Sequence, residues 1–588
     1  MNKIVTNLPK PGWKSTVISN SRELLLKGAP YLDMEQQTVQ AMANDWPDDL
    51  GDAAQLRQFL RRYSGFYSVV YSLPGQLVAS VDRIRSIPLF YGVANSQFYL
   101  SDNAEWVRQQ VGDEFTDPVA REELQLVGYV TGQDTLFPQV KQLQAGECLI
   151  AEQSGGEINV RCQRYHRYLH TEPKQYDEQA LRQQFDHVVV KVVRRLIDYA
   201  AGRQIVIPLS GGYDSRLVAT QLKRLGYDNV LTFTYGVAGN KDSQYSKQVA
   251  DTLGFKWHFV EYTPELWRST WESAEGWRYQ SWASGWGSLA HEQDWPAVKM
   301  LKQEGVVSAD AVFAPGHIVI SFIGGRYSPV EALRKLILTQ TGTAAELYKH
   351  HYCLAPQNVS THPPRFWQKR ITSRIAQHEG ADNVNSPISF DCDVEEWCWQ
   401  ERQAKYTVNS VRVYEFFNYD WWLPFWDKDF FEFWREAPFA LRKGREWYVN
   451  YSKAQYASQT GAKETTMLGN ACESRLRIAI GTLVKKLPHF VWNIHVGLPK
   501  WVRIARIIKE DASALDQIGM FPRSKTKWLL KNGYTRYGIF AYFFLESIKL
   551  NVECRPALPT THGSANSTKP ANDKLTAING SVGWENHL

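Results

Sequence analysis

The sequence predicts a two-domain α/β protein in which an antiparallel, β-rich N-terminal domain precedes a doubly wound parallel sheet. Residues 60–100 alternate short apolar runs with turn residues, a pattern typical of antiparallel hairpins. From about residue 175 the pattern changes to long helical periodicities that alternate with short, continuous apolar runs. Alternating helices and buried strands are typical of a parallel sheet covered by helices on both faces.

Length and composition support this division. The 588 residues exceed the roughly 100–200 residues of one ordinary domain, and a hydrophobic content of 44% is enough for large cores. We expect residues 1–170 to form the first domain and residues 178–550 the second. Residues 555–588 are polar and rich in Gly, Ser and Asn, so we expect a disordered tail there.

Charge and cysteine content exclude several classes of protein. The 67 basic and 61 acidic residues give a net charge of +6, which is too small to indicate a nucleic-acid partner. The seven cysteines form no C-x-x-C pair, so neither a zinc site nor a disulfide framework is expected. The chain shows no signal peptide and no apolar stretch of roughly 18 residues, so we expect a cytoplasmic protein.

A basic cluster and an aromatic segment can each be interpreted in two ways. Arg503, Arg506 and Lys509 share one helical face, which belongs either to a packed surface helix or to a peripheral contact with an anionic membrane. The aromatic segment 419–434 is expected in the core, although such rings also suit a substrate with an apolar or sugar face.

One short stretch carries most of the chemistry. Residues 205–222, IVIPLSGGYDSRLVATQL, read as a buried strand, a tight loop and a helix. Gly211 and Gly212 let the backbone curl so that its N–H groups point inward, and the helix N-terminus adds its positive dipole end. The loop is therefore predicted to hold an anion. It lacks the Gly-Lys-Ser/Thr ending of the common mononucleotide loop.

The side chains of this loop indicate which anion it holds. Ser210 and Ser215 can donate to phosphate oxygens, and Asp214 is a natural ligand for magnesium, which binds through one or two carboxylates plus substrate phosphates. These groups suit the pyrophosphate of ATP, cleaved between the α and β phosphates. The alternative is an ordinary tight turn in which Asp214 only complements the helix dipole.

The loop sequence SGGYDSR resembles that of the N-type ATP pyrophosphatases, the PP-loop superfamily that includes asparagine synthetase. Residues 65–92 resemble the N-terminal glutaminase-type domain of the asparagine synthetase family, and residues 127–149 and 414–443 follow in the family's order. The resemblance covers about residues 55–455. It implies an Ntn-hydrolase-like α+β sandwich followed by a PP-loop synthetase domain with a doubly wound parallel sheet.

The resemblance also implies an activity and a binding site. Members are ATP- and Mg²⁺-dependent amide ligases that adenylate a carboxylate, by default aspartate, for attack by ammonia or an amine with release of AMP and pyrophosphate. The implied nucleotide site joins the loop to Leu209, Phe233, Gly236 and Gly316. The family also places lysines after the proline that is Pro438 here, in a region where this chain carries Arg442, Lys443 and Arg445. Lys443 is the counterpart that the resemblance implies, and a solvated basic cluster is the alternative.

The N-terminal domain departs from the family pattern. The family's glutaminase uses a cysteine at position 2, whereas this chain has Asn2 and no cysteine before Cys148. We therefore expect no glutaminase activity, and nitrogen that comes as free ammonia, from a separate glutaminase or from an amine substrate. Asp82 and Arg83 are expected to form a structural ion pair rather than a working site.

The synthetase domain departs as well. Ile320 and Ser321 stand where the family carries an Asp that binds magnesium and a Glu that assists deprotonation. With Asp214 left alone, magnesium binding should weaken. His317 is a candidate replacement base, since imidazole titrates near neutral pH, or else a turn or core histidine.

Three functions follow from these observations. The favoured one is the amide ligase, because its loop is complete. A nucleotide-binding pseudoenzyme with a scaffold or regulatory role is the alternative, motivated by Ile320 and Ser321. A tRNA sulfurtransferase is disfavoured because paired cysteines are missing.

Overall fold

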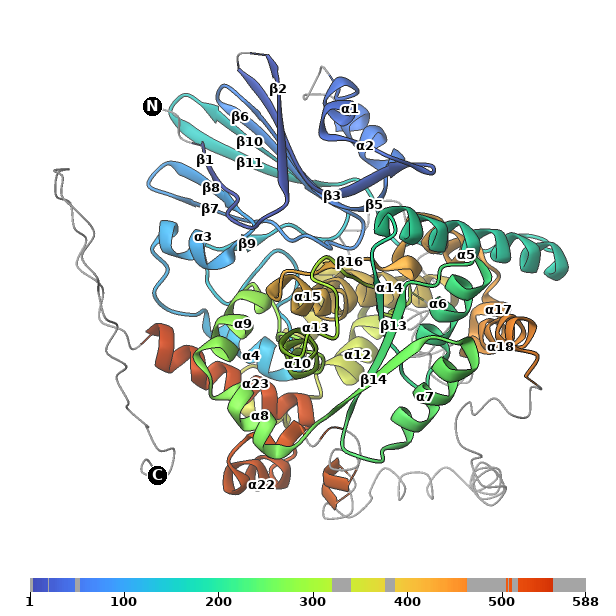
Figure 1. Cartoon of the computed structure of the whole chain (residues 1–588). Helices are drawn as coiled ribbons and strands as arrows, with labels where there is room; N and C mark the ends of the chain where they lie inside the picture. Colours follow the sequence, from blue (N-terminus) through green and yellow to red (C-terminus); the bar gives the residue numbers. More distant parts are fainter. Residues whose placement is uncertain are drawn as a thin grey trace, which may run out of the picture.

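A computed structural model describes residues 4–19, 21–47, 53–319, 340–375, 387–462, 504–505, 507–509, 515 and 517–553 (Figure 1). The predicted tail at residues 555–588 lies outside them, as do Arg503, Arg506, Ile320 and Ser321. Among the described residues, no helix is both long enough and apolar enough to cross a membrane.

The N-terminal part contains two β-sheets. One sheet has the order β11-β10-β6-β5-β3-β2 with β4 on β3, and the other has the order β1-β8-β7-β9. The strands are β1 (Ile4–Asn7), β2 (Trp13–Ser19), β3 (Arg22–Leu32), β4 (Glu35–Gln36), β5 (Ser64–Leu73), β6 (Gln76–Val81), β7 (Phe90–Ala94), β8 (Gln97–Ser101), β9 (Lys141–Gln142), β10 (Glu147–Ser154) and β11 (Glu157–Arg164). Tight antiparallel turns join β5 to β6 and β7 to β8, which confirms the predicted hairpins.

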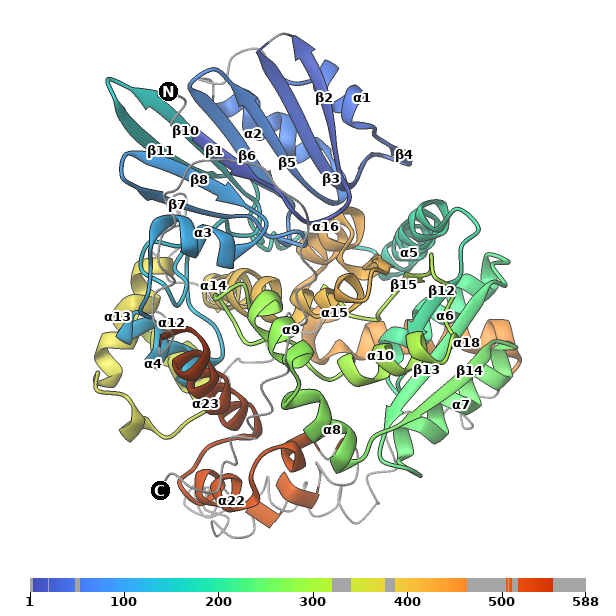
Figure 2. The same ribbon diagram turned by 60° about the vertical axis from the view of Figure 1, so that its left-hand side comes forward.

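The two sheets pack face to face (Figure 2). Leu77 and Ala79 of β6 face a core shared with Phe98 and Leu100 of β8. Val78 points the opposite way, into a second core beneath α1 (Val39–Asn44) and α2 (Ala53–Arg62). Because successive side chains of a strand alternate between faces, the continuous apolar run of β6 reflects burial on both sides.

The second part is built on a parallel sheet with the order β14-β13-β12-β15-β16. Its elements are α5 (Glu178–Ala200), β12 (Ile205–Pro208), α6 (Tyr213–Arg224), β13 (Val230–Gly236), α7 (Lys241–Leu253), β14 (Lys256–Glu261), β15 (Val312–Phe313) and β16 (Asp420–Trp421). All of its strand pairs are parallel, as predicted. The chain leaves β12 toward β13 and later returns on the other side as β15. Such a reversal opens a crevice at the carboxyl ends of the strands.

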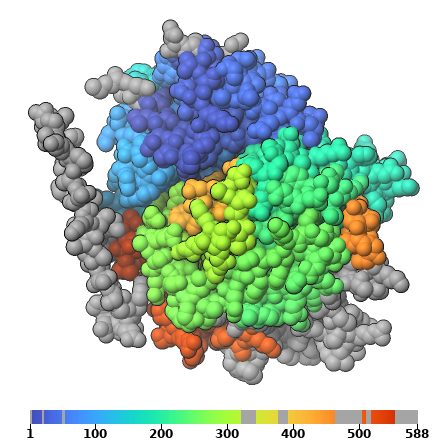
Figure 3. Space-filling model, viewed as in Figure 1, coloured from blue at the N-terminus to red at the C-terminus, as the bar shows by residue number. Residues whose placement is uncertain are grey.

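The remaining helices pack around the sheets of both parts. They include α3 (Ala104–Val111), α4 (Pro118–Val127), α8 (Pro264–Trp271), α9 (Ala274–Ser284), α10 (Trp295–Gln303), α12 (Gln340–His351), α13 (Pro364–Ile375), α14 (Pro387–Trp397), a π-helical segment (Cys398–Thr407), α15 (Arg412–Phe416), α16 (Lys428–Glu436), α17 (Phe439–Arg442), α18 (Glu446–Thr460), α22 (Arg523–Lys531) and α23 (Arg536–Ile548). In Figure 3 the blue N-terminal part covers one end of this assembly.

Aromatic residues join the two parts. Trp422, which follows β16, packs its ring against Tyr31 of β3 and Phe66 of β5, with centroid distances of 5.6 and 4.7 Å. It also stacks on Tyr199 of α5 at 4.7 Å. Trp422 is only 1% exposed, which confirms the predicted core role of this aromatic segment.

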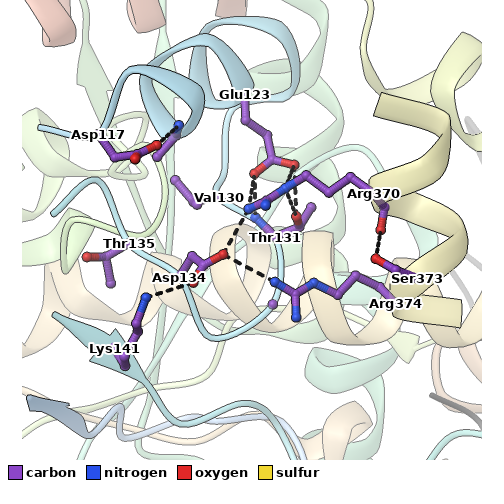
Figure 4. Close-up of polar contacts among 12 residues, drawn as sticks. Asp117, Glu123, Val130, Thr131, Asp134, Thr135, Lys141, Arg370, Ser373 and Arg374 are labelled. Carbon is purple, nitrogen blue, oxygen red and sulfur yellow. Dashed lines mark hydrogen bonds and ion pairs between the residues drawn. The ribbon is translucent and has the colours of Figure 1, made fainter. Parts of the chain in front are cut away.

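A network of charged side chains forms a second junction (Figure 4). Arg370 of α13 donates through Nε to Glu123 of α4 over 3.1 Å and through Nη2 to Asp134 over 3.0 Å. Arg374 and Lys141 contact the same Asp134. Glu123 is fully buried, so it depends on the Arg370 guanidinium and its other hydrogen-bond donors to offset its loss of hydration.

The prediction of an ion pair between Asp82 and Arg83 is wrong. The Asp82 carboxylate accepts hydrogen bonds from the backbone N–H groups of Tyr67 and Ile84, over 3.0 and 2.9 Å. The Arg83 guanidinium donates instead to backbone carbonyls, including that of Arg61 over 2.6 Å. Both side chains are therefore structural, but each one satisfies backbone groups rather than the other.

Candidate active site

The predicted anion loop lies at the carboxyl end of β12, where α6 begins. The backbone N–H of Ser210 donates to Oγ of Ser215 over 3.2 Å, and the two hydroxyl oxygens lie 3.3 Å apart. The N–H of Gly212 donates to Oγ of Ser210 over 3.2 Å. Short-range hydrogen bonds thus close the loop and bring two hydroxyl groups to one point beside the helix N-terminus.

The N-terminus of α6 is available to an anion. Gly212 is its N-cap residue and contributes no side-chain hydrogen bond to the first turn. The first N–H groups of a helix have no partner within the helix, and the helix dipole makes this end positive. An anion such as phosphate is the usual partner for this arrangement.

Two glycines permit close packing around the loop. A Cβ atom on Gly211 would lie 2.9 Å from Oδ1 of Asp242, in the first turn of α7. A Cβ atom on Gly316 would lie only 2.3 Å from the backbone nitrogen of Ser215. The segment after β15 therefore presses directly on the first turn of α6, which places Gly316 beside the loop.

A cavity of about 250 Å³ opens next to the loop, at the carboxyl ends of β12 and β13. This volume is near the lower end of small-molecule pockets, which is roughly 300 Å³. Three of the predicted nucleotide-site residues line it, namely Leu209, Ser210 and Phe233. Gly236 ends β13, and its carbonyl accepts from the N–H of Tyr262 over 2.8 Å within the sheet.

The cavity also includes residues that the sequence analysis missed. Asn240 and Asp242 line it from the start of α7, and Gln293 lines it from the segment before α10. A signal existed for the first two, because they follow the carboxyl end of β13 just as the loop follows β12. Nothing in the local sequence distinguishes Gln293, which reaches the cavity through tertiary packing.

An arginine contacts the predicted magnesium ligand. Nη2 of Arg445 lies 2.6 Å from Oδ1 of Asp214. Burial raises the pKa of Asp214, and the positive charge of Arg445 opposes that rise. Arg445 has a left-handed backbone with φ of 63°, and it follows Gly444 with φ of 68°. A non-glycine residue in this conformation costs about 1–3 kcal/mol and persists where its surroundings hold it in place.

The three basic residues after Pro438 have different surroundings in the structure. Arg445, rather than Lys443, is the cation that contacts the loop. Lys443 is exposed to solvent at the end of α17. Arg442 is buried in an ion pair with Glu395. The predicted role of Lys443 in stabilising charge on the acyl-adenylate stays a prediction.

His317 follows Gly316 and is half-buried near the loop. Burial is the main cause that lowers its pKa to about 4, and the neighbouring His291 contributes to this shift. Its Nδ1 atom lies 3.2 Å from Oγ of Ser410. The imidazole is therefore neutral at pH 7 and only weakly basic, which agrees better with a core histidine than with a base tuned to neutral pH.

The side chains near the loop could hold a magnesium ion. Among the described residues, no three His, Cys, Asp or Glu side chains gather into a metal-binding cluster. Magnesium needs fewer protein ligands, since one carboxylate plus substrate phosphates is a common arrangement. Asp214, with the Ser210 and Ser215 hydroxyls nearby, provides that minimum, although Arg445 holds one of its oxygens.

Part of the chain matches a known protein family. Residues 184–275 match the family model of asparagine synthase. The match spans most of α5, then β12, the loop, α6, β13, α7 and β14. The predicted resemblance to the asparagine synthetase family is confirmed for this segment, which contains the anion loop.

Curated relatives match the chain over short stretches. A probable glutamine-hydrolysing asparagine synthetase of Acanthamoeba polyphaga mimivirus is 34% identical over 102 residues, which is 16% of this chain and 18% of the relative. An NH₃-dependent NAD⁺ synthetase of Pyrococcus furiosus is 37% identical over 78 residues, which is 13% of this chain and 30% of the relative. The chain thus covers less than a third of the length of each of these two relatives.

Solved structures of low similarity were also found. An NH₃-dependent NAD synthetase from Campylobacter jejuni has 14% identity and a TM-score of 0.19, covering 26% of this chain and 62% of its own. An NMN synthetase from Francisella tularensis has 11% identity and a TM-score of 0.19, covering 39% of this chain and 97% of its own.

Proposed function

We propose that this protein is an ATP-dependent amide ligase. It adenylates a carboxylate, aspartate or a related acid, and ammonia or an amine then attacks the acyl-adenylate with release of AMP and pyrophosphate. The observation that carries the proposal is the loop at the α6 N-terminus, with its paired hydroxyls and adjoining cavity, inside the segment that matches asparagine synthase.

The residues of the loop have distinct roles in this proposal. The N–H groups at the start of α6 and the Ser210 and Ser215 hydroxyls hold the pyrophosphate oxygens. Asp214 binds Mg²⁺ together with those oxygens, and the ion neutralises charge on the leaving pyrophosphate when bound. The adenine lies in the cavity beside Leu209 and Phe233, toward Gly236 at the end of β13.

The basic residues after Pro438 stabilise charge that develops during adenylation. Arg445 is the better candidate because its guanidinium already reaches the loop, whereas Lys443 is exposed. With Asp214 engaged by Mg²⁺, the Arg445 guanidinium would be free to contact the reacting phosphate oxygens. A cation placed in advance of the reaction is among the strongest devices for stabilising a transition state.

The N-terminal residues, about 1–170, form a degenerate Ntn-hydrolase-like domain in this proposal. The packing of two β-sheets between helices supports the architecture. Asn2 in place of a cysteine supports the loss of glutaminase activity. Nitrogen then comes from free ammonia, from a separate glutaminase or from an amine. Free cysteines and the use of ATP support a cytoplasmic location.

A nucleotide-binding pseudoenzyme is the second candidate, and one observation favours it. Arg445 already pairs with Asp214, the remaining metal ligand, at 2.6 Å. If this pair persists when ATP binds, the chain holds a nucleotide without magnesium chemistry. The absence of carboxylates at Ile320 and Ser321 points the same way.

Carboxylate-dependent exchange of pyrophosphate into ATP tests the proposal. The full chain is assayed with Mg²⁺ over a panel of acids that includes aspartate and sugar acids, beside Asp214→Ala. Exchange with one acid that disappears in the variant supports adenylation and names the substrate class. ATP binding without exchange for any acid would support the pseudoenzyme.

A further inference from the structure

A cluster of hydrogen-bond acceptors without donors lies deeper than the nucleotide cavity. Oε2 of Glu292 and the Oε1 atoms of Gln280 and Gln517 are enclosed and have no hydrogen-bond partner among the described residues. Buried polar atoms are nearly always satisfied, so three such oxygens in one region call for a ligand. The two amide oxygens are acceptors, and Oε2 of Glu292 is one when its carboxyl group is ionised, so the missing partner is a donor.

These oxygens line two small cavities that meet at Glu292. One cavity is shared by Glu292, Gln517, Tyr406, Tyr537 and Phe540, and the other by Glu292, Gln280, Tyr279 and Trp295. Each offers about 10 Å³ of free space. That volume is close to the minimum for one water-sized molecule, so a substrate with a carbon skeleton is too large.

One of the small cavities adjoins the nucleotide cavity at Gln293, the residue after Glu292. Gln293 lines both the cavity beside the loop and the one that contains Tyr537. Its Nε2 atom donates to the Tyr537 hydroxyl over 3.4 Å. Adjacent residues of one segment therefore place the unpaired acceptors next to the predicted site of adenylation.

The surroundings of Glu292 favour a small cation. Burial raises the pKa of Glu292 well above its usual range, so a bound positive charge would stabilise the ionised form. The neighbouring His291 cannot provide that charge, since burial lowers its pKa. Aromatic rings line both cavities and attract cations through their π faces. Ammonium is water-sized, positively charged and carries only donors.

We propose that Glu292 and its two cavities form an ammonium site that delivers the nitrogen donor to the nucleotide cavity. This inference rests on the proposed ligase function and narrows its nitrogen source to ammonium. The site lies near α8 and α23, on the side away from the N-terminal sheets (Figures 1 and 2). Nitrogen then enters without passing through the degenerate N-terminal domain.

The proton balance of this delivery is simple. Bound ammonium transfers one proton to the Glu292 carboxylate, so an N–H bond breaks, an O–H bond forms and the electron pair stays on nitrogen. The resulting ammonia attacks the acyl-adenylate carbonyl and expels AMP. The attacking nitrogen then loses one proton to solvent to give the amide, and the Glu292 carboxyl group releases its proton to solvent before the next ammonium binds. The raised pKa of Glu292 makes it a stronger base toward ammonium than an exposed carboxylate.

Steady-state kinetics of Glu292→Gln test the site. With the acid that supports pyrophosphate exchange, we expect the KM for ammonium chloride to rise about tenfold or more, with a much smaller change in kcat. Gln517→Leu removes a second acceptor and should raise the same KM to a smaller extent. Glu272→Gln, an exposed acid at the end of α8, makes the same charge change outside the cavities and should leave it unaltered.

A binding measurement separates this inference from the ligase proposal. Ammonium chloride should raise the Tm of the full chain above that in sodium chloride at equal ionic strength, whereas tetramethylammonium, which is too large, should not. Glu292→Gln should abolish the difference. An unaltered KM and an unaltered Tm difference in Glu292→Gln would overturn the ammonium site even if exchange is active. Missing exchange beside an ammonium-specific Tm shift would overturn only the ligase.

Discussion

Arg445 and Asp214 are 231 positions apart in the sequence, yet the guanidinium Nη2 and the carboxylate Oδ1 lie 2.6 Å apart at the N-terminus of α6. The left-handed backbone at Gly444 and Arg445 turns the chain so that the guanidinium reaches the loop. The positive charge of this arginine would repel a magnesium ion that binds the same carboxylate. The pair therefore sets how readily the loop accepts Mg²⁺ with ATP.

Substitution of Arg445 should separate metal binding from adenylation. In Arg445→Gln, Mg²⁺ should bind the ATP-free chain more tightly because Asp214 loses its competitor, while pyrophosphate exchange falls about 100-fold because a positioned cation is missing. Isothermal titration calorimetry and the exchange assay measure the two effects. Arg365→Gln, at an exposed position of α13, is the matched control.

The same substitution at Lys443 discriminates between the two cations. If Lys443 provides the charge, as the family resemblance implies, Lys443→Gln should lower the exchange more than Arg445→Gln does. The structure leads us to expect the reverse order, since only Arg445 of the two has an ion pair with the loop among the described contacts.

Gly316 offers a steric test of how the loop is supported. In Gly316→Ala the new methyl group would meet the backbone nitrogen of Ser215 at 2.3 Å, so the first turn of α6 must shift. We expect ATP affinity to fall at least about tenfold and the free energy of unfolding to drop by about 1–3 kcal/mol. Fluorescence titration with ATP and urea unfolding measure these changes.

Gly226→Ala is the control for that substitution. Gly226 follows the opposite end of α6 with φ of +73° and open space around its would-be Cβ atom. Alanine there strains the backbone without a clash, so stability should fall modestly while ATP affinity stays the same. Equal losses of ATP affinity in both variants would mean that the effect of Gly316→Ala is general destabilisation.

Local residues of the site could be predicted from the sequence, and distant ones could not. Ser210, Asp214 and Ser215 lie within one strand–loop–helix unit, whose geometry follows from apolar periodicity and from two glycines. Arg445 required the fold, because its position relative to the loop depends on where α17 ends and how α18 packs on α6. A two-residue change of register in that turn decides between Lys443 and Arg445.

The parallel sheet was predictable for the same reason, whereas the contacts of the N-terminal part were less so. Strand β12 and its neighbours appear as apolar runs at regular spacing. Asp82 and Arg83, in contrast, suggested an ion pair only because they are adjacent and opposite in charge. Adjacent side chains that follow a strand point in different directions. The Asp82 and Arg83 side chains therefore form hydrogen bonds with backbone groups instead of with each other.

The low pKa of His317 predicts how stability depends on pH. The folded-state pKa is about 4, below the usual 6.5, so the folded chain binds this proton less well than the unfolded chain. Stability is therefore complete above pH 6.5 and is lost as the pH falls from 6.5 toward 4. The contribution of this one histidine is up to about 3 kcal/mol.

Urea unfolding of His317→Gln at pH 7.5 and pH 5 checks this dependence. The variant should lose less stability than the wild type between the two pH values, because glutamine does not take up a proton. His187→Gln, at an exposed position of α5, should match the wild-type dependence. A wild-type slope in His317→Gln would show that other buried histidines, such as His351, account for the loss.

The network around Glu123 predicts a strong stability effect at the junction between α4 and α13 (Figure 4). In Arg370→Met the buried Glu123 carboxylate loses its arginine, and breaking a buried pair in this way costs about 3–5 kcal/mol. Arg365→Met, one turn earlier on the exposed side of α13, should cost less than about 0.5 kcal/mol. Urea unfolding measures both values.

The double variant Arg370→Met with Glu123→Gln shows whether the cost comes from the unpaired charge. Removing the buried charge should restore part of the stability, since Thr131 and Tyr352 can still donate to the amide oxygen at position 123. If the double variant is as unstable as the sum of the two single variants, the charge is not the cause. The loss would then come from the packing of the Arg370 side chain between α4 and α13.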